Sequence, residues 1–200
     1  MRAPRQLRLR SRIVLVRHGP SAHVERSLLL DRPGVEAWRV AYDAAGIQAD
    51  AQPPESLVRL AAAATHLIAS DLPRALGSAR RLGSSRAILS SELLRESALS
   101  IPNWEIRMPL GLWGMLISAA WFYRIARGTD MSDTERARTS AAADWLIGMA
   151  GGNSTLLAIT HGAFRRMLAR ELATRGWTCA ERQGGYRNWS AWTFIPPSQI

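Results

Sequence analysis

The stretch Ile13-Val14-Leu15-Val16-Arg17-His18-Gly19 joins a short apolar run to a charged turn that ends in glycine. A run of this kind predicts a buried strand. The pattern recurs at Thr65-His66-Leu67-Ile68-Ala69 and again over residues 155–160, which lead into His161. Because apolar strands alternate with helical patterns, we expect an α/β fold, a three-layer α/β/α sandwich with a mostly parallel central sheet.

Helical spacing fills the intervals between these strands. Apolar residues recur every three or four positions over residues 54–64, 72–82 and 162–175. Ser132 and Glu135 predict a capping box that opens a helix reaching Met149, with Glu135 reaching back to the cap. We also expect a weaker strand near 87–89 or 92–94 and a late aromatic strand over 188–195, near an edge of the sheet.

The length of 200 residues predicts one domain, which we place at residues 13–200. An aromatic, apolar insertion over residues 99–130 is expected to form a cap over one end of the sheet. An oligomer interface, and so a possible homodimer, or a membrane-surface contact are the alternatives. Its longest uncharged run, residues 108–123, is shorter than the roughly 20 residues that cross a bilayer, so we expect no stable membrane span.

The charge of the chain is strongly positive, at +10, and all 26 basic residues are arginine. Two explanations compete for this excess of arginine. Arginine could be selected to bind phosphate, or the composition of the protein could simply be biased toward arginine, and bias is the better explanation for most positions. Five arginines lie in a basic arm, residues 1–12, which has no interleaved aromatic residues, so we expect no specific nucleic-acid partner. The arm lacks the apolar segment of a signal peptide, and Cys179 is the single cysteine, which favours a cytoplasmic location.

Charged residues follow the expected strands at their carboxyl ends. Arg17 and His18 follow the first strand, Arg74 opens the helix after the second, and His161 follows the third. The carboxyl ends of neighbouring parallel strands lie close together, and they are the usual ligand position in such sheets. Arginines and helix N-termini favour an anion, so we expect a phosphate pocket that Gly19 and Gly162 let the backbone approach closely.

These residue types suit phosphoryl transfer. His18 is the expected nucleophile, because a neutral imidazole attacks phosphorus near pH 7 and the phosphohistidine is then hydrolysed. Arg17, Arg74 and His161, protonated or as a donor tautomer, would stabilise the transferring group. The leaving alkoxide needs an acid at the pocket rim, for which Glu96 is the first candidate and Asp71 and Glu92 are the alternatives. Asp71 is expected to have a lowered pKa beside Arg74.

Four ordered segments resemble the histidine phosphatase superfamily, which includes phosphoglycerate mutase-like enzymes. They are Leu15-Val-Arg-His-Gly19, Ser70-Asp-Leu-Pro-Arg-Ala75, a glutamate about twenty residues on, and Ile159-Thr-His-Gly162. The resemblance implies a phosphohistidine on His18, phosphate binding by Arg17, Arg74 and His161, and proton donation by Glu96. Where the family often has threonine and asparagine after the Arg-His-Gly, this chain has Ser21, which supplies a hydroxyl, and Val24, which supplies no amide.

The expected function is a metal-independent phosphatase with no cofactor. Its partners would be a small-molecule phosphate ester and the product inorganic phosphate. The alternatives are a phosphoglycerate mutase-like phosphomutase, which the acid-bearing segment near Glu96 does not closely resemble, and a non-catalytic module that binds phospho-ligands. Arg165 and Arg166 are expected on a solvated helix face, with substrate contact as the second interpretation.

Overall fold

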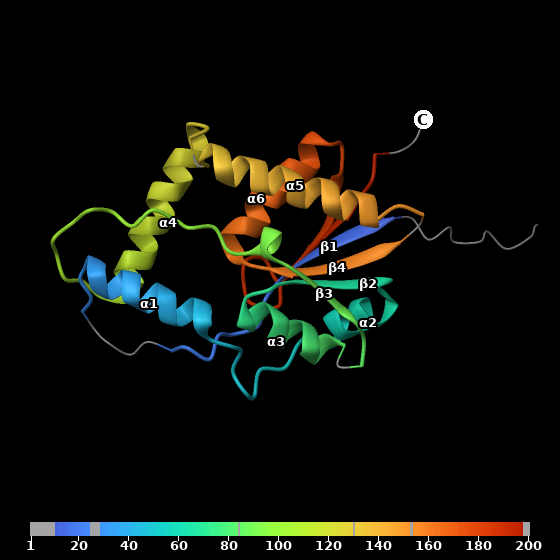
Figure 1. The fold of residues 1–200 in the computed structure, drawn as a ribbon, viewed down its shortest axis with the longest axis horizontal. Coiled ribbons are helices and arrows are strands. Elements are labelled where there is room, and N and C mark those ends of the chain that lie inside the picture. Colours follow the sequence, from blue (N-terminus) through green and yellow to red (C-terminus); the bar gives the residue numbers. More distant parts are fainter. Residues whose placement is uncertain (1–10, 25–28, 84, 130, 153, 198–200) are drawn as a thin grey trace, which may run out of the picture.

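The computed structural model of the chain describes residues 11–24, 29–83, 85–129, 131–152 and 154–197 (Figure 1). Most of the basic arm expected over residues 1–12 therefore lies outside the described residues.

Within the described ranges, six strands form one mixed sheet in the order β3-β2-β4-β1-β6-β5. Their bounds are β1 Arg12–Arg17, β2 His66–Ser70, β3 Ile88–Ser91, β4 Thr155–Thr160, β5 Thr178–Gln183 and β6 Ala191–Ile195. Neighbours among β3, β2, β4 and β1 pair in parallel, while β6 pairs antiparallel with both β1 and β5. The expected mostly parallel sheet is confirmed, and β5, which sequence patterning missed, occupies the edge beyond the expected late strand.

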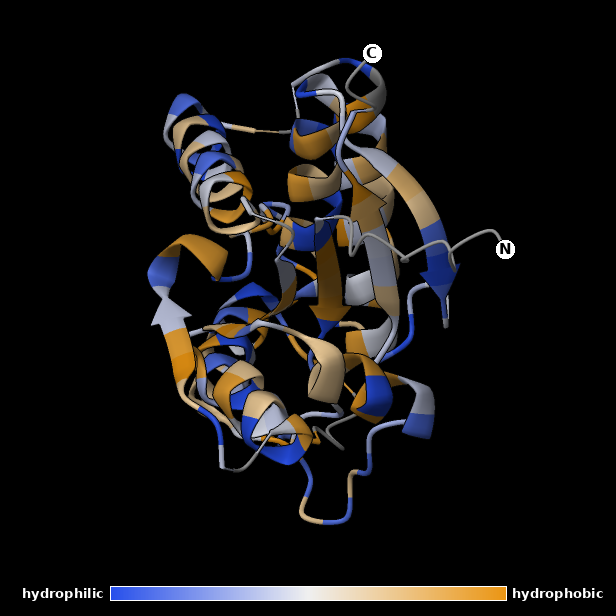
Figure 2. Cartoon of the chain, turned by 90° about the vertical axis from the view of Figure 1, so that its right-hand side faces the viewer, coloured by the Kyte–Doolittle hydropathy of each residue, from blue (hydrophilic) through white to orange (hydrophobic). Residues whose placement is uncertain are grey.

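Helices cover both faces of the sheet. The α-helices are α1 Arg32–Ala44, α2 Glu55–Ala63, α3 Pro73–Leu82, α4 Leu110–Ala126, α5 Asp133–Met149 and α6 Gly162–Thr174, and a 3-10 turn, η1, spans Glu92–Leu94. Side chains of β1 alternate between two cores. Ile13 and Leu15 pack with α5 and α6, whereas Val14 and Val16 pack with α2 and α3. Figure 2 shows hydrophobic residues concentrated in the central strands, so the three-layer sandwich is confirmed.

The strand register brings the sequence motifs together. Arg17 at the end of β1 is opposite Thr160 at the end of β4, and Ala69 in β2 is opposite Ile159. The residues that follow these strands therefore leave the sheet at one edge. The backbone amide of His18 donates to the Thr160 carbonyl at 3.0 Å, which extends the β1–β4 pairing into the histidine motif.

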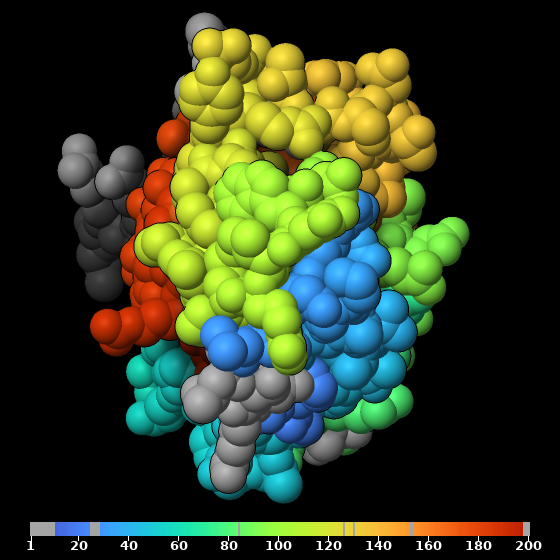
Figure 3. Space-filling view, turned by 90° about the vertical axis from the view of Figure 1, so that its left-hand side faces the viewer, coloured from blue at the N-terminus to red at the C-terminus, as the bar shows by residue number. Residues whose placement is uncertain are grey.

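Helices α1 and α4 lie beyond the carboxyl ends of β1 and β4 (Figure 1). Helix α1 was missed from the sequence, although Asp31 caps it by accepting a hydrogen bond from the Gly34 amide. Helix α4 comes from the aromatic insertion and packs on α1 through Trp113, which is fully buried against Val35. Figure 3 shows the yellow-green surface of α4 beside the blue surface of α1.

The expected capping box is half correct. Ser132 caps α5 by accepting a hydrogen bond from the Glu135 amide at 3.2 Å. The Glu135 carboxylate does not reach back to the cap, because it accepts hydrogen bonds from Ser97 and Arg138 instead. A charge-assisted bond to arginine is stronger than one to a neutral amide, which accounts for the difference.

Candidate active site

His18 lies directly after β1 and is almost completely buried. Its Nδ1 atom is 2.6 Å from the Gly19 carbonyl oxygen, which can only accept a hydrogen bond. Nδ1 therefore carries the proton, and the lone pair lies on Nε2. Arg74 Nε donates to this Nε2 at 3.3 Å, which agrees with the same tautomer. The ring is thus fixed with its unprotonated nitrogen directed toward the Arg74 guanidinium.

Arg74, in the first turn of α3, is fully buried and held on several sides. Its Nη1 donates to the Tyr42 carbonyl at 3.0 Å, and its Nη2 is 3.0 Å from the Asp43 carboxylate. The Tyr42 ring lies 4.4 Å from the guanidinium carbon. Helix α1 therefore positions the arginine beside His18, a role for Tyr42 and Asp43 that sequence reasoning missed because the whole helix was missed.

His161, which follows β4, is also completely buried. Its ring centroid lies 5.1 Å from that of His18. Neither His161 ring nitrogen nor Arg17 Nε has a hydrogen-bond partner among the described residues. Buried polar groups normally have partners, so unpaired nitrogens gathered beside His18 are suited to a polar ligand. The structure thus brings Arg17, His18, Arg74 and His161 to the same strand ends.

Burial sets the charge of the two histidines. Burial is the main cause that lowers the pKa of His18 to about 3, and the nearby Arg74 and Arg17 lower it further. Burial likewise holds the pKa of His161 well below its usual value, with His18 and Arg74 as additional causes. Both rings are therefore neutral near pH 7. Of the two states expected for His161, the structure favours the donor tautomer over the protonated ring.

The two glycines have different surroundings. A Cβ atom on Gly19 would lie 2.3 Å from a ring carbon of Trp189, so its missing side chain gives room to an indole. The close approach at Gly19 is therefore to Trp189, and the Gly19 amide is already engaged, since it donates to Ser78 Oγ at 2.8 Å. A Cβ on Gly162 would lie 3.6 Å from the guanidinium carbon of Arg17, which places that arginine beside the start of α6.

Ser21 forms a local turn away from these contacts. Its Oγ accepts a hydrogen bond from the His23 amide at 3.2 Å, and its backbone forms a bridge with Ile47. These contacts do not join Ser21 to His18, Arg74 or His161. A phosphate contact by Ser21 therefore stays a prediction.

Glu96 is remote in the sequence from α6, but its side chain lies against the first turn of that helix. Its carboxylate accepts hydrogen bonds from the Phe164 amide at 2.9 Å and the Ala163 amide at 3.3 Å. Glu96 also lines a cavity of about 240 Å³ together with Arg17 and Gly162. The first candidate for the acid thus lies at the pocket, and it occupies two of the α6 amides that we had expected to face the anion.

The other two acids lie elsewhere, around Arg95. Asp71 accepts two hydrogen bonds from Arg95 Nε, at 2.8 and 3.0 Å, and a third from Nη2. These bonds lower the pKa of Asp71, so the expected direction is confirmed, but the partner is Arg95 and not Arg74. Glu92 is exposed and lies 3.8 Å from the same arginine. Of the three candidate acids, only Glu96 lines the cavity beside Arg17.

The loop between β5 and β6 holds the histidine motif from the other side. Asn188 Nδ2 donates to the carbonyl oxygens of His18, at 2.9 Å, and Gly19, at 3.2 Å. Trp189 has a positive φ of 62°, an uncommon backbone conformation for a bulky residue, and packs against Gly19. No local signal in the sequence predicts these long-range contacts.

Arg165 corrects the expectation of a solvated helix face. It is fully buried in α6 and donates to the Ser190 carbonyl at 2.8 Å and to the Gly185 carbonyl at 3.2 Å. Burial lowers its pKa to about 10, so it remains charged at neutral pH. Arg165 therefore fastens the β5–β6 loop to α6.

Two other kinds of feature are absent from the described part of the chain. No group of three or more His, Cys, Asp or Glu side chains there is arranged to hold a metal ion. None of the described helices is long and apolar enough to span a membrane.

Comparisons with known proteins give similarity in structure alone. No family model matches the chain, and no curated protein matches its sequence. A mycobacterial glucosyl-3-phosphoglycerate phosphatase, solved with VO3, is 19% identical over 92% of this chain and 90% of its own, with a TM-score of 0.50. A phosphoserine phosphatase from Entamoeba histolytica is 15% identical over 92% and 96%, with a TM-score of 0.47.

A third similar structure is a putative alpha-ribazole-5'-P phosphatase from Escherichia coli, which is 16% identical over 80% of this chain and 78% of its own, with a TM-score of 0.42. The similarity to the glucosyl-3-phosphoglycerate phosphatase shows that the two chains share a fold, which agrees with the resemblance carried by the four sequence segments. These three similar structures are named as phosphatases, the last of them as a putative one.

Proposed function

We propose that the protein is a phosphatase that hydrolyses a phosphomonoester through a phosphohistidine intermediate on His18. The observation that carries the proposal is the state of His18, a neutral ring whose Nε2 lone pair lies 3.3 Å from Arg74 Nε. A nucleophile fixed beside a buried cation is suited to attack a phosphate dianion, because the cation binds the equatorial oxygens.

In the first step, His18 Nε2 attacks phosphorus and the bond from phosphorus to the ester oxygen breaks. Arg17, Arg74 and a ring N–H of His161 stabilise the charge on the transferring group. Glu96 gives a proton to the departing oxygen, so that the alcohol leaves neutral. The Nδ1 proton stays on the ring, where the Gly19 carbonyl stabilises the positive charge that develops on phosphorylation.

In the second step, water attacks the phosphorus of the phosphohistidine. The Glu96 carboxylate accepts a proton from this water, and the bond from phosphorus to Nε2 breaks. Inorganic phosphate leaves, and both His18 and Glu96 return to their starting protonation states. The amide hydrogen bonds to Glu96 support the proposal, because they hold its carboxylate at the cavity that the ester oxygen would enter.

The proposal also gives a role to the domain and to the aromatic insertion. Residues 13–200 act as one domain, and the insertion over residues 99–130 acts as a cap on the substrate. The position of Trp121 and Phe122 in the wall of the 240 Å³ cavity supports this assignment.

The stereochemistry at phosphorus tests the intermediate. With an aryl phosphate made chiral by oxygen isotopes and an alcohol as acceptor, we expect transfer with retention, because two in-line displacements restore the configuration. We also expect release of inorganic phosphate from a panel of phosphomonoesters. Inversion at phosphorus would overturn the phosphohistidine.

The alternative functions give different products in the same assays. Transfer to the hydroxyl of a phosphorylated sugar acid without release of phosphate would identify a phosphomutase. Binding of phosphate esters in calorimetry, with no turnover of any of them, would identify a non-catalytic module. Either result would overturn the phosphatase.

The role of Glu96 predicts a dependence on the leaving group. Glu96→Gln should lower kcat/KM for an alkyl phosphate about 100-fold or more, because its alkoxide cannot leave without a proton. For 4-nitrophenyl phosphate, whose phenolate leaves unprotonated, the loss should be below about 10-fold. Steady-state kinetics on both esters measure the two losses. Equal losses would contradict the role, and Asp71→Asn and Glu92→Gln would then be compared as the alternative acids.

A further inference from the structure

The cavity beside the candidate active site has a second end that the phosphate chemistry does not use. It is lined by Arg17, Glu96 and Gly162, and also by Trp121 and Phe122 of α4 and by residues of α6 and the β5–β6 loop. Because Gly162 opens α6 beside Arg17, the part of the cavity one turn further along α6 is taken as its far end. An ester whose phosphoryl group is at His18 would place its leaving group in this cavity. The far end therefore faces the part of the substrate that differs between phosphomonoesters.

Arg166 is the charged residue at this far end. It lies four residues after Gly162, so the two share one face of α6 and are separated by about 6 Å along the helix axis. The charged side chains that line the cavity are Arg17, Arg166 and Glu96, which leaves an excess of one positive charge. Since Arg17 is assigned to the phosphoryl group and Glu96 to the leaving oxygen, Arg166 is the cation left to face the leaving group.

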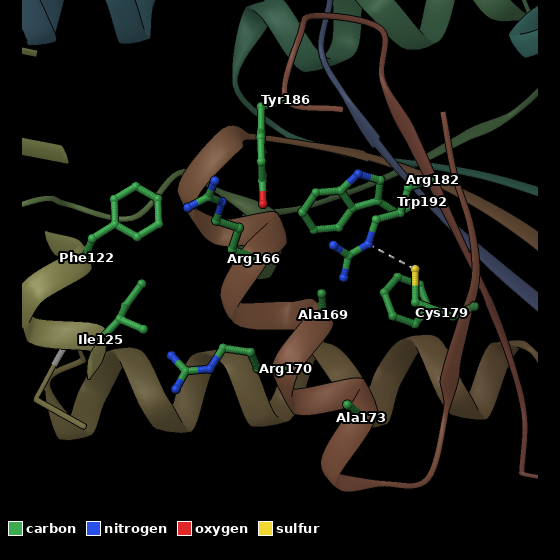
Figure 4. A pocket seen from close by; sticks show the side chains of 11 residues that line it. Phe122, Ile125, Arg166, Ala169, Arg170, Ala173, Cys179, Arg182, Tyr186 and Trp192 are labelled. Atoms are coloured by element: carbon green, nitrogen blue, oxygen red, sulfur yellow. Dashed lines mark hydrogen bonds between the residues drawn. The ribbon is translucent and has the colours of Figure 1, made fainter. Parts of the chain in front are cut away.

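Aromatic rings surround the Arg166 guanidinium. Its central carbon lies 3.8 Å from the ring centroid of Tyr186, 4.4 Å from that of Phe122 and 5.6 Å from that of Trp121. Figure 4 shows the guanidinium between the rings of Phe122 and Tyr186. The Tyr186 side chain also takes one hydrogen bond from the guanidinium. The N–H groups that the rings and this contact leave free can bind a planar carboxylate with two parallel hydrogen bonds.

The charge of Arg166 has no acidic partner in the described part of the chain. Some arginines with little solvent contact face carboxylates, as Arg74 faces Asp43 and Arg138 faces Glu135, whereas the buried Arg165 is held by backbone carbonyls. Neither kind of partner is found for Arg166 among the described residues, and partial burial is the main cause that lowers its pKa. A partly buried cation without a carboxylate partner would gain from pairing with a ligand anion.

We propose that Arg166 recognises a carboxylate on the leaving group of the substrate, and that the leaving group also has an apolar body that packs against Trp121 and Phe122. The inference rests on the proposed phosphatase and names its substrate class as phosphate esters of apolar hydroxy acids. A single guanidinium matches one singly charged, planar group, whereas a second phosphate would bring more charge than this end of the cavity balances.

A pair of aryl phosphates tests the proposal. 4-Carboxyphenyl phosphate and 4-carbamoylphenyl phosphate have the same shape, and only the first has a carboxylate. For the wild-type protein, kcat/KM should be at least about 10-fold higher for the carboxylate ester, as charge-assisted pairing in a partly buried site predicts. Arg166→Met should reduce this ratio to about one, because the variant has no charge that distinguishes the two esters. Arg166→Lys should give an intermediate ratio, because lysine keeps the charge without the bidentate edge.

Arg182→Met is the matched control. It removes one positive charge from the neighbouring surface, and Arg182 lines an adjacent cavity but not this one. The control should keep the wild-type ratio. An equal fall of the ratio in Arg182→Met would assign the preference to the general positive field and overturn the inference. An unchanged ratio in both Arg166→Lys and Arg166→Met would also overturn it.

Failure of the inference and failure of the proposed function are distinguishable. If wild-type protein hydrolyses both esters through His18 but shows no ratio that depends on Arg166, the phosphatase stands and the substrate class is wrong. If His18→Asn hydrolyses the carbamoyl ester as fast as the wild type, the phosphohistidine mechanism fails whatever Arg166 does.

Discussion

Replacing His18 by asparagine should lower kcat/KM for 4-nitrophenyl phosphate by about 10⁴-fold or more, on the scale found when a covalent nucleophile is removed. Asparagine can keep a donor for the Gly19 carbonyl, which accepts from the ring Nδ1 in the wild type, but it has no nucleophilic nitrogen. The variant should therefore bind phosphate at the same place and fail to form the intermediate.

His66→Asn is the matched control for this loss. His66 begins β2, at the opposite end of that strand from Ser70, so the same substitution there should change kcat/KM by less than about twofold. Thermal unfolding and calorimetry with inorganic phosphate would confirm that both variants are folded and that His18→Asn still binds the anion. A His18→Asn variant that keeps more than a tenth of wild-type activity would rule out the nucleophile.

The free energy of unfolding should fall by about 2 kcal/mol between pH 8 and pH 5 from His18 alone, and His161 should add a loss of the same sign. In the folded protein both pKa values lie below the usual 6.5, that of His18 at about 3. The unfolded chain therefore binds protons below pH 6.5 that the folded chain does not bind. The loss continues as the pH falls toward 3.

Urea unfolding at the two pH values measures this dependence. His18→Asn should remove about 2 kcal/mol of it and His161→Asn should also make it smaller, whatever they do to stability at pH 8, because only the titrating group is lost. His66→Asn serves again as the control. Equal stability of the wild type at pH 8 and pH 5 would contradict the neutral, buried state of the two rings.

The sequence predicted the parallel part of the sheet because each strand carries its own local signal. The apolar runs before Arg17, Asp71 and His161 became β1, β2 and β4 with bounds close to those expected. Strand β5 has no such signal, since Thr178–Gln183 is a mostly polar segment without an apolar run and it lies at an exposed edge. Helix α1 was missed although its cap at Asp31 and the helical spacing of Val35, Trp38 and Tyr42 were both readable in the sequence.

The candidate site was predicted in part for the same reason. Strand ends and helix starts are local features, so Arg17, His18, Arg74 and His161 could be grouped before their distances were known. The neighbours that set their properties come from elsewhere in the chain. Asp71 pairs with Arg95, 24 residues away, and a bond between such positions has no local pattern.

The sequence by itself determined the order of the strands along the chain, the residues at their carboxyl ends and the phosphate chemistry those residues suit. Only the tertiary structure decided that Glu96 alone of the three acids lines the cavity, that Arg165 is buried, and that Arg166 lies among aromatic rings. The physical reason is distance along the chain. Periodicity and capping act over a few residues, whereas burial and charge pairing depend on which remote segments the packed core brings together.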